Sequence, residues 1–201
     1  MNTDFRTNDF ATSASGLLRR ATALHDAGKL LEAIATLREA YAAIACDSKN
    51  HTVTTFLRLP TYLQEAGQRE EAWNAIFELL TNGYPTQPSN PDLIAMDRSA
   101  IYRALQLFLE RDGHLIHAAL YGVLAIYYWA LGLRSQKRMA EFSAFVSPRR
   151  LGDEIGKLLR KANRLDLIPA LVPVVKTELD RVPPRADAVL ASEIKAILQI
   201  Q

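Results

Sequence analysis

Apolar residues recur at helical spacing along this chain. They stand three or four positions apart, so that they fall on one face of an α-helix, while polar residues occupy the opposite face. No stretch of sequence shows the alternation of apolar and polar residues, bounded by turn residues, that is typical of a β-strand. The pattern therefore predicts an all-α protein. One clear stripe consists of Leu30, Leu31, Ile34, Leu37, Tyr41 and Ile44.

Glycine, proline and small polar residues divide the predicted helices. Breaks are expected at 27–28, 47–50, 66–67, 82–91, 112–113, 147–148 and 182–184. Asn90 before Pro91 and Ser147 before Pro148 have the order of an N-cap residue followed by proline at the first helical position. The Pro-rich connection 81–92 is the only long predicted loop. It is a candidate boundary between an N-terminal four-helix part and the rest of the chain.

A short motif occurs three times. Each copy has a glycine in a short turn, a leucine four positions before it and a small residue five positions after it. Small residues at this place let the two helices of a hairpin approach closely, so the motif predicts three antiparallel helical hairpins. The glycine and the seam positions after it are Gly28, Ala33, Leu37 and Ala40; Gly67, Ala72, Ile76 and Leu79; and Gly113, Ala118, Gly122 and Ala125, while the leucines are Leu24, Leu63 and Leu109.

The motif resembles the tetratricopeptide repeat (TPR), and the resemblance covers about residues 14 to 132. The sequence also departs from that family, because glycine-to-glycine spacings of 39 and 46 residues exceed the usual repeat length of about 34. Residues that match the family's large and leucine positions are Leu17, Phe56, Tyr102, Leu59 and Leu105, and residues that depart from its leucine or small positions are Arg20, Pro60 and Gln106.

The resemblance implies a right-handed solenoid of stacked antiparallel hairpins, whose first helices line a concave groove. We expect a flexible N-terminus at 1–13, a TPR-like repeat region at 14–146 and C-terminal capping helices at 147–201. A looser helical bundle is the alternative. In the cap, helical spacing predicts two apolar seams, one of Ile168, Leu171, Val175 and Leu179 and one of Val189, Ile194, Ile197 and Leu198.

Binding of a protein or peptide in this groove, without catalysis, is the function that the resemblance implies. TPR proteins that hold the carboxylate tails of chaperones carry Lys and Asn at certain groove positions, whereas Leu18, Thr22, Leu57, Thr61, Arg103 and Leu107 occupy those positions here. This difference argues against such a tail as the ligand. Solvated helix surface is the alternative for each groove residue. The predicted groove residues are His25, Gln64, Arg103, Leu107, Glu110 and Arg111.

Charge is unevenly distributed along the chain. Residues 51–100 carry 3 basic and 6 acidic side chains, whereas residues 134–164 carry 9 basic and 3 acidic ones. This basic patch is a candidate surface for nucleic-acid phosphates, anionic lipid or an acidic protein, with a solvated face as the alternative. No aromatic side chain stands among the cations of the predicted helix that begins at Pro148, which weakens a single-strand-binding interpretation. The patch consists of Arg134, Lys137, Arg138, Arg149, Arg150, Lys157, Arg160, Lys161 and Arg164.

Catalytic and metal-binding patterns are weak in this sequence. His114 and His117 could place two nitrogens on one metal, but no third ligand accompanies them in a recognisable motif. Cys46 and His51 could form a thiolate pair, yet Cys46 continues the apolar phase of its predicted helix. Glycine-rich phosphate loops and the GxSxG motif are absent from the sequence. We therefore expect no enzyme activity, no cofactor and no metal site.

Composition and one long apolar run bear on location. The 201 residues have a formal net charge of +2 and a single cysteine, and the N-terminus does not have the pattern of a secretory signal. The 19 residues from Leu115 to Leu133 would form a helix of about 28 Å, just enough to cross a membrane. A central helix covered by its neighbours is the interpretation we favour. A cytoplasmic protein with a protein or peptide partner is expected, with nucleic acid second and a membrane least favoured.

Overall fold

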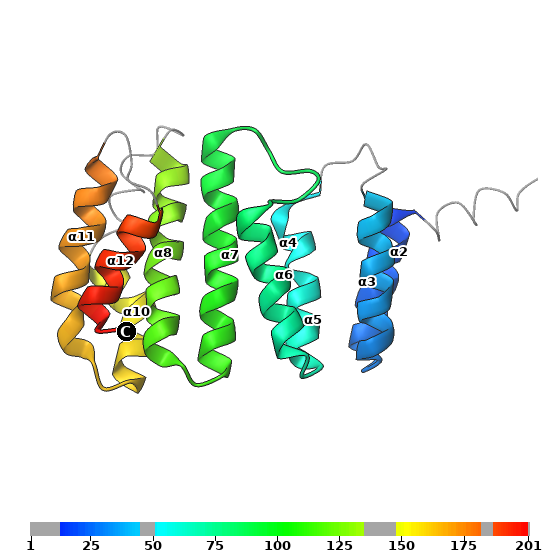
Figure 1. The fold of residues 1–201 in the computed structure, drawn as a ribbon, viewed down its shortest axis with the longest axis horizontal. Coiled ribbons are helices and arrows are strands. Elements are labelled where there is room, and N and C mark those ends of the chain that lie inside the picture. Colours follow the sequence, from blue (N-terminus) through cyan, green and yellow to red (C-terminus); the bar gives the residue numbers. More distant parts are fainter. Residues whose placement is uncertain (1–12, 45–50, 135–147, 182–186, 201) are drawn as a thin grey trace, which may run out of the picture. The chain divides into compact units, whose positions relative to one another are not determined.

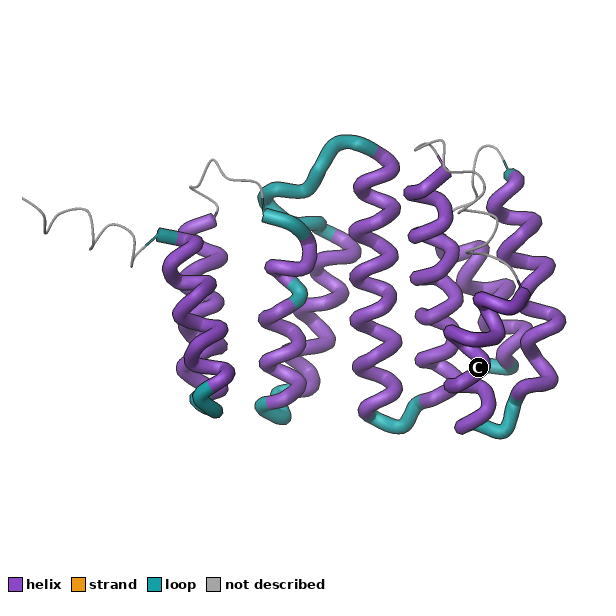
Figure 2. The backbone as a smooth tube through the Cα atoms, turned by 180° about the vertical axis from the view of Figure 1, so that it is seen from behind, coloured by secondary structure: helices purple, strands orange, loops and turns teal. Residues whose placement is uncertain are grey.

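A computed structural model describes residues 13–44, 51–134, 148–181 and 187–200. The regular structure in these ranges is helical, and they contain no strand (Figure 2). The predicted all-α class is therefore confirmed. The chain divides into two compact units, Met1–Gln87 and Pro88–Gln201, and the boundary between them falls inside the Pro-rich connection 81–92.

The first unit contains two helical hairpins. In the first hairpin, α2 (Ala14–Asp26) is followed by α3 (Leu30–Ile44), and in the second, α5 (Arg58–Glu65) is followed by α6 (Arg69–Thr81), with the short α4 (Val53–Phe56) before α5 (Figure 1). Ser13 caps α2, because its side chain accepts a hydrogen bond from the backbone N–H of Gly16 at 3.2 Å. Helices α4 and α5 do not form one continuous helix, since Pro60 in the first turn of α5 has no N–H to donate to the carbonyl of Phe56.

The second unit is built around the long hairpin of α7 (Pro91–Arg111) and α8 (Leu115–Arg134). Then follow α10 (Pro148–Lys161), the 3-10 helix η1 (Leu165–Leu167), α11 (Ile168–Asp180) and α12 (Asp187–Leu198). The predicted cap at Asn90 is confirmed, because its side chain accepts from the N–H of Asp92 at 2.9 Å and Pro91 opens α7. The predicted cap at Ser147 lies outside the described residues.

The three glycine turns have one backbone geometry. Gly28, Gly67 and Gly113 have φ angles of +74°, +77° and +80°, in the left-handed region that favours glycine. In each turn the backbone N–H of the residue after the glycine donates to the carbonyl oxygen of the predicted leucine. The bonds run from Lys29 to Leu24 at 2.8 Å, from Gln68 to Leu63 at 2.9 Å and from His114 to Leu109 at 2.8 Å. This bond closes the helix end as in a Schellman motif. The predicted seam alanines Ala33, Ala72 and Ala118 are all 0% exposed, so close helix pairing is confirmed.

A fourth turn of this kind joins α10 to the helices that follow it. Asn163 takes the place of the glycine with a φ of +57°, and the N–H of Arg164 donates to the carbonyl of Leu159, four positions before Asn163, at 2.7 Å. Asparagine is the non-glycine residue that enters this conformation most readily. The geometry of the three predicted hairpins therefore recurs in the predicted C-terminal cap.

The long apolar run forms α8, at the centre of the second unit. Its stretch Leu115–Gly132 is long and apolar enough to cross a membrane, and 67% of that stretch is buried within the structure. Helices α7, α10, α11 and α12 all pack against α8. In Figure 1, α7 lies on one side of α8 and the other three helices lie on the opposite side. Such burial is typical of the central helix of a helical unit.

Two residues of the predicted stripes lie on the wrong side of their helices. Leu31 is 68% exposed and Val189 is 48% exposed. In α12 the buried residues are Leu190, Ile194 and Leu198, a stripe of strict four-residue spacing that leaves position 189 outside. In α3 the small residue Ala33 occupies the contact face, which turns Leu31 toward solvent.

Candidate functional site

A charged cavity of about 430 Å³ lies between α7 and α10 in the second unit. Helix α7 presents Arg103, Gln106 and Glu110, at spacings of three and four that place them on one face. Helix α10 presents cationic side chains toward the same space, together with Asp153 and the apolar Leu158. The residues that line this α7–α10 cavity are Arg103, Gln106, Glu110, Asp153, Lys157, Leu158, Arg160 and Lys161.

A buried amide holds Arg103 at the edge of the cavity. Gln106 is only 2% exposed, and its Oε1 atom accepts a hydrogen bond from Nη1 of Arg103. Since the partner of Arg103 is a neutral amide, this bond orients the guanidinium without neutralising its charge.

Gly122 of α8 makes room for this amide. A Cβ atom at Gly122 would lie 2.6 Å from Cδ1 of Ile155 and 3.0 Å from Oε1 of Gln106. Ile155 of α10 is 0% exposed, and its Cδ1 atom is the nearest one to such a Cβ. The missing side chain at position 122 therefore lets α10 approach α8 and leaves space for the Gln106 amide in the seam of the three helices.

Positive charge exceeds negative charge around the cavity. Four lining residues are cationic (Arg103, Lys157, Arg160 and Lys161) and two are acidic (Glu110 and Asp153). Nζ of Lys161 forms an ion pair with the Glu110 carboxylate at 2.6 Å, whereas no carboxylate of the described residues pairs with Arg103, Lys157 or Arg160. A concave surface with unbalanced positive charge attracts anions more strongly than a flat one.

The cavity brings together members of two separately predicted sets. From the predicted groove, Arg103 and Glu110 line it; Leu107, which is 39% exposed, and the exposed Arg111 do not, and His25 and Gln64 belong to the first unit. From the basic patch, Lys157, Arg160 and Lys161 line it, while Arg164 is 3.4 Å from the carboxylate of Asp166. The remaining members, Arg134, Lys137, Arg138, Arg149 and Arg150, lie outside the residues whose side chains are described.

Three lining residues, Gln106, Asp153 and the apolar Leu158, were not among the predicted site residues. Gln106 was visible in the sequence only as a departure from the small residue of the repeat motif. A large polar residue at a position that the helical pattern buries is uncommon unless it has a hydrogen-bond partner. That mismatch was the available signal. Asp153 carried no comparable signal, because an acid on the polar face of an amphipathic helix is ordinary.

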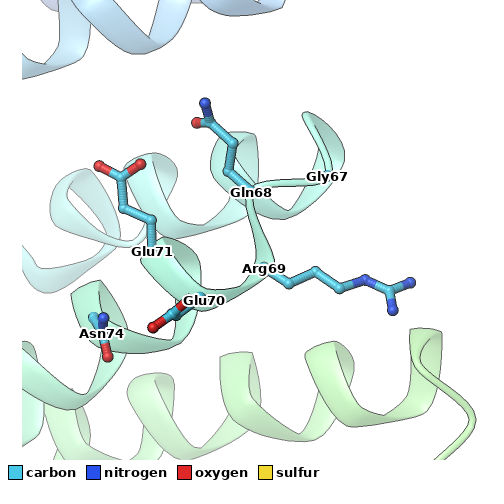
Figure 3. A pocket seen from close by; sticks show the side chains of 6 residues that line it. All are labelled: Gly67, Gln68, Arg69, Glu70, Glu71 and Asn74. Carbon is cyan, nitrogen blue, oxygen red and sulfur yellow. The ribbon is translucent and has the colours of Figure 1, made fainter.

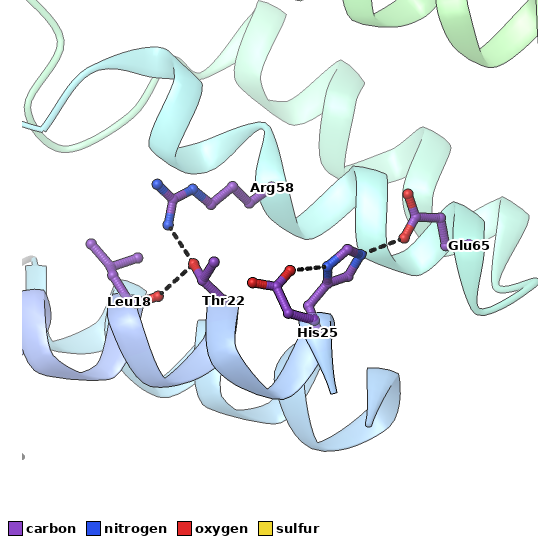
Figure 4. Close-up of polar contacts among 6 residues, drawn as sticks. Leu18, Thr22, His25, Arg58 and Glu65 are labelled. Atoms are coloured by element: carbon purple, nitrogen blue, oxygen red, sulfur yellow. Dashed lines mark hydrogen bonds and ion pairs between the residues drawn. The ribbon is translucent and has the colours of Figure 1, made fainter. Parts of the chain in front are cut away.

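His25 takes part in packing within the first unit. Its Nε2 atom lies 2.8 Å from the Glu65 carboxylate (Figure 4). Its ring stacks on Tyr62, with the ring centroids 4.1 Å apart. The hydrogen bond with Glu65 raises the pKa of His25, with a smaller contribution from Asp26 at 3.4 Å. Nearby, Nη1 of Arg58 donates to Oγ1 of Thr22 at 3.3 Å. These contacts join α2 to α5.

A second hollow, of about 490 Å³, lies at the start of α6 and is lined by residues 67–71 and Asn74. Figure 3 shows that the Arg69 side chain extends away from those of Gln68 and Glu71. Glu71 is already paired with Arg38 of α3. This hollow therefore lacks the convergent polar groups that a ligand site requires.

The candidate catalytic residues form no assembled site in the described part of the chain. The rings of His114 and His117 have centroids 6.2 Å apart in an edge-to-face arrangement. Among the described residues, no three His, Cys, Asp or Glu side chains are grouped so that they could hold a metal ion. Cys46 lies outside the described residues, so the structure does not bear on the pairing with His51 that the sequence argues against.

Comparison of the chain with protein-family models, with curated proteins and with solved structures gave no match.

Proposed function

We propose that this chain is a non-catalytic, cytoplasmic helical-repeat protein that binds a protein or peptide partner in a groove, and that the α7–α10 cavity is part of that groove. The observation that carries the proposal is the meeting of Arg103 and Glu110 of α7 with Lys157, Arg160 and Lys161 of α10 around one cavity. Two sets of residues that are about 50 positions apart thereby form one recognition surface.

The repeat geometry supports this proposal. Helices α7 and α10 each precede a left-handed turn, at Gly113 and Asn163 respectively, so each is the first helix of a hairpin-like pair. A TPR-like solenoid places first helices along its concave side. The recurrence of one turn geometry at Gly28, Gly67, Gly113 and Asn163 favours such a solenoid over a looser bundle.

The chemistry of the cavity favours an acidic segment of a polypeptide. Arg103, Lys157 and Arg160 attract carboxylates, while Glu110 and Asp153 can accept hydrogen bonds from N–H and O–H groups. A polypeptide carries both kinds of group. A nucleic-acid backbone offers a continuous row of phosphates that the two acids would repel, and none of the described residues that line the cavity is aromatic and able to stack on bases.

A direct binding measurement tests the proposal. Fluorescently labelled peptides of equal length, one of Glu and Ser and one of Lys and Ser, are titrated with the full chain beside a single-stranded RNA. The acidic peptide is expected to bind, and Arg103→Glu should weaken its binding at least about tenfold, as expected when one partner of a close charge pair is reversed. Arg111→Glu is the matched control, since this exposed arginine of α7 does not line the cavity.

Salt separates the peptide from the nucleic-acid alternative. Binding to nucleic acid should fall steeply between about 50 and 200 mM salt, because each phosphate contact releases counterions. Preferential, steeply salt-dependent binding of the RNA would favour the nucleic-acid function of the basic patch. Equal binding of the acidic and basic peptides would contradict the groove proposal.

A further inference from the structure

A second cavity, of about 200 Å³, lies within the first unit and differs chemically from the α7–α10 cavity. We refer to it as the aromatic cavity. Its wall is formed mainly by carbon atoms of aromatic, proline and aliphatic side chains from α3, α4, α5, α6 and the loop after α6. Its lining residues are Tyr41, Phe56, Leu59, Pro60, Ala75, Glu78, Leu79, Gly83, Tyr84 and Pro85.

Three aromatic rings form a continuous wall of this cavity. The Phe56 ring lies between Tyr41 and Tyr84, with centroid distances of 5.1 and 4.9 Å. Gly83, with a φ of +71°, turns the chain after α6 so that Tyr84 reaches Phe56. Tilted ring pairs at these distances are favourable contacts in their own right. The wall therefore keeps its shape without a ligand.

Hydrogen bonds fix the parts of the chain that carry the rings. The Tyr41 hydroxyl donates to the carbonyl of Thr55 at 2.6 Å and accepts from the N–H of Leu59 at 3.3 Å. Burial raises the pKa of Tyr41, so this hydroxyl stays neutral. The loop after α6 is held to the start of α4, since Oγ1 of Thr86 donates to the carbonyl of His51 at 2.6 Å. A cavity built in this way is largely preformed.

Among the described residues that line the cavity, Glu78 alone is charged. It is exposed, and no cation of the described residues pairs with its carboxylate. A ligand that places an apolar group against the rings and a positive charge beside Glu78 would satisfy both features. Aromatic faces add to this preference, because they attract cations.

We propose that the aromatic cavity binds a small arylalkyl amine, with the aryl group against Tyr41, Phe56 and Tyr84 and the ammonium group paired with Glu78. The cavity volume of about 200 Å³ limits the size of the ligand. Larger drug-sized ligands occupy pockets of about 300 Å³ or more. All lining residues belong to Met1–Gln87, so this inference is independent of the acidic-peptide proposal.

The test compares benzylamine with benzyl alcohol, which has nearly the same shape and no charge. Both are titrated into the full chain and followed by NMR chemical-shift changes of Tyr41, Phe56 and Tyr84. Benzylamine is expected to bind roughly two- to fivefold more tightly, the range of an exposed ion pair, and this preference should shrink at high salt. Glu78→Gln should remove the preference, whereas Glu70→Gln, an exposed acid of α6 outside the cavity, should keep it.

A second variant tests the location. Ala75→Leu adds bulk to the cavity wall and should abolish binding of both probes, while the amide spectrum away from the cavity shows that the chain is folded. The proposal is overturned if the two probes bind the wild-type chain equally, if neither probe shifts the three aromatic residues, if Glu78→Gln keeps the preference, or if folded Ala75→Leu still binds benzylamine with unchanged affinity.

Discussion

Asp187, the first residue of α12, accepts a hydrogen bond from Nη1 of Arg98 on α7 at 2.6 Å. The same carboxylate accepts from the hydroxyl of Tyr102 at 3.2 Å and from the hydroxyl of Tyr128 on α8. Arg98 also lies over the Tyr128 ring, 5.6 Å from its centroid. Burial, together with the Asp187 charge, raises the pKa of Tyr102. One carboxylate thus ties the last described helix to both helices of the long hairpin.

Replacing Asp187 should release α12 from this hairpin. In Asp187→Ala the three donors lose their common acceptor, and we expect a loss of about 1–2 kcal/mol in the free energy of unfolding. Hydrogen exchange should rise in 190–198 before it rises in α7. Asp166→Ala is the control, because the Asp166 side chain is 65% exposed and its partner Arg164 lies 3.4 Å away. Equal losses for the two variants would show that the Asp187 bonds do not hold α12.

Gly122 and Gly156 should respond in opposite ways to substitution by alanine. At Gly122 the added Cβ meets Ile155 at 2.6 Å and Gln106 at 3.0 Å, whereas at Gly156 the nearest atom is Cδ1 of Ile168 at 3.5 Å, an ordinary contact. Gly122→Ala should lower the free energy of unfolding by about 1–2 kcal/mol through overpacking. Gly156→Ala should leave it unchanged or raise it by up to about 1 kcal/mol through helix propensity. Denaturant unfolding measures both.

Gly122→Ala should also weaken binding of the acidic peptide, because the displaced Gln106 no longer orients Arg103. Gly156→Ala should leave peptide affinity unchanged. If the folded Gly122→Ala chain binds the acidic peptide as tightly as the wild type, Gln106 has no positioning role in the cavity.

The His25–Glu65 contact should make stability depend on pH. The pKa of His25 is raised in the folded chain above its ordinary value of 6.5. The contact between protonated His25 and Glu65 therefore stabilises the folded chain fully below about pH 6.5, and this stabilisation is lost as the pH rises through the folded-state pKa of His25. The advantage of the wild type over His25→Gln in unfolding free energy, under about 1 kcal/mol for this partly exposed pair, should shrink between pH 6 and pH 8.5. An NMR titration giving a His25 pKa below 6.5 would contradict this assignment.

Alanine should destabilise the chain at each left-handed turn, whereas glycine should be accepted at Asn163. At Gly28, Gly67 and Gly113 no atom lies within 4 Å of an added Cβ, so the cost of alanine is the conformation alone, about 1 kcal/mol at each turn. Asn163→Gly should be neutral or slightly stabilising, while Asn163→Ala should cost a similar 1 kcal/mol or so. Thermal unfolding of the four alanine variants provides the measurement. A stabilising effect of alanine at Gly113 would show that the turn geometry is wrong.

Local features of the fold followed from the sequence because they depend on neighbouring residues. A glycine five positions before a small residue was enough to predict the turns at Gly28, Gly67 and Gly113 and the burial of Ala33 and Ala118. The equivalent turn at Asn163 was missed, since asparagine enters the left-handed region less often than glycine and so gives a weaker signal. Val189 was misplaced because it directly precedes Leu190 and fits a helical apolar stripe almost as well. The buried stripe of α12 consists of Leu190, Ile194 and Leu198, at strict four-residue spacing.

The candidate site could be predicted only in part. Arg103 and Lys157 were each identified within their own helix, one as a groove residue and one as part of the basic patch. Their meeting in one cavity depends on the packing of α10 against α7 and α8, which rests on Gly122 and Ile155. Tertiary contacts of this kind join residues far apart in the sequence, and helical periodicity carries no information about them. The aromatic cavity escaped notice for the same reason, because its walls come from four helices and a loop.

Reversing the charge of the α7–α10 cavity tests the proposed recognition most directly. The affinities of the acidic and the basic peptide are measured for the wild-type chain and for the double variant Lys157→Glu and Arg160→Glu, whose folded state is checked by denaturant unfolding. The wild type should prefer the acidic peptide, and the double variant should prefer the basic one. An unchanged preference in the folded double variant would show that partner binding does not take place in this cavity.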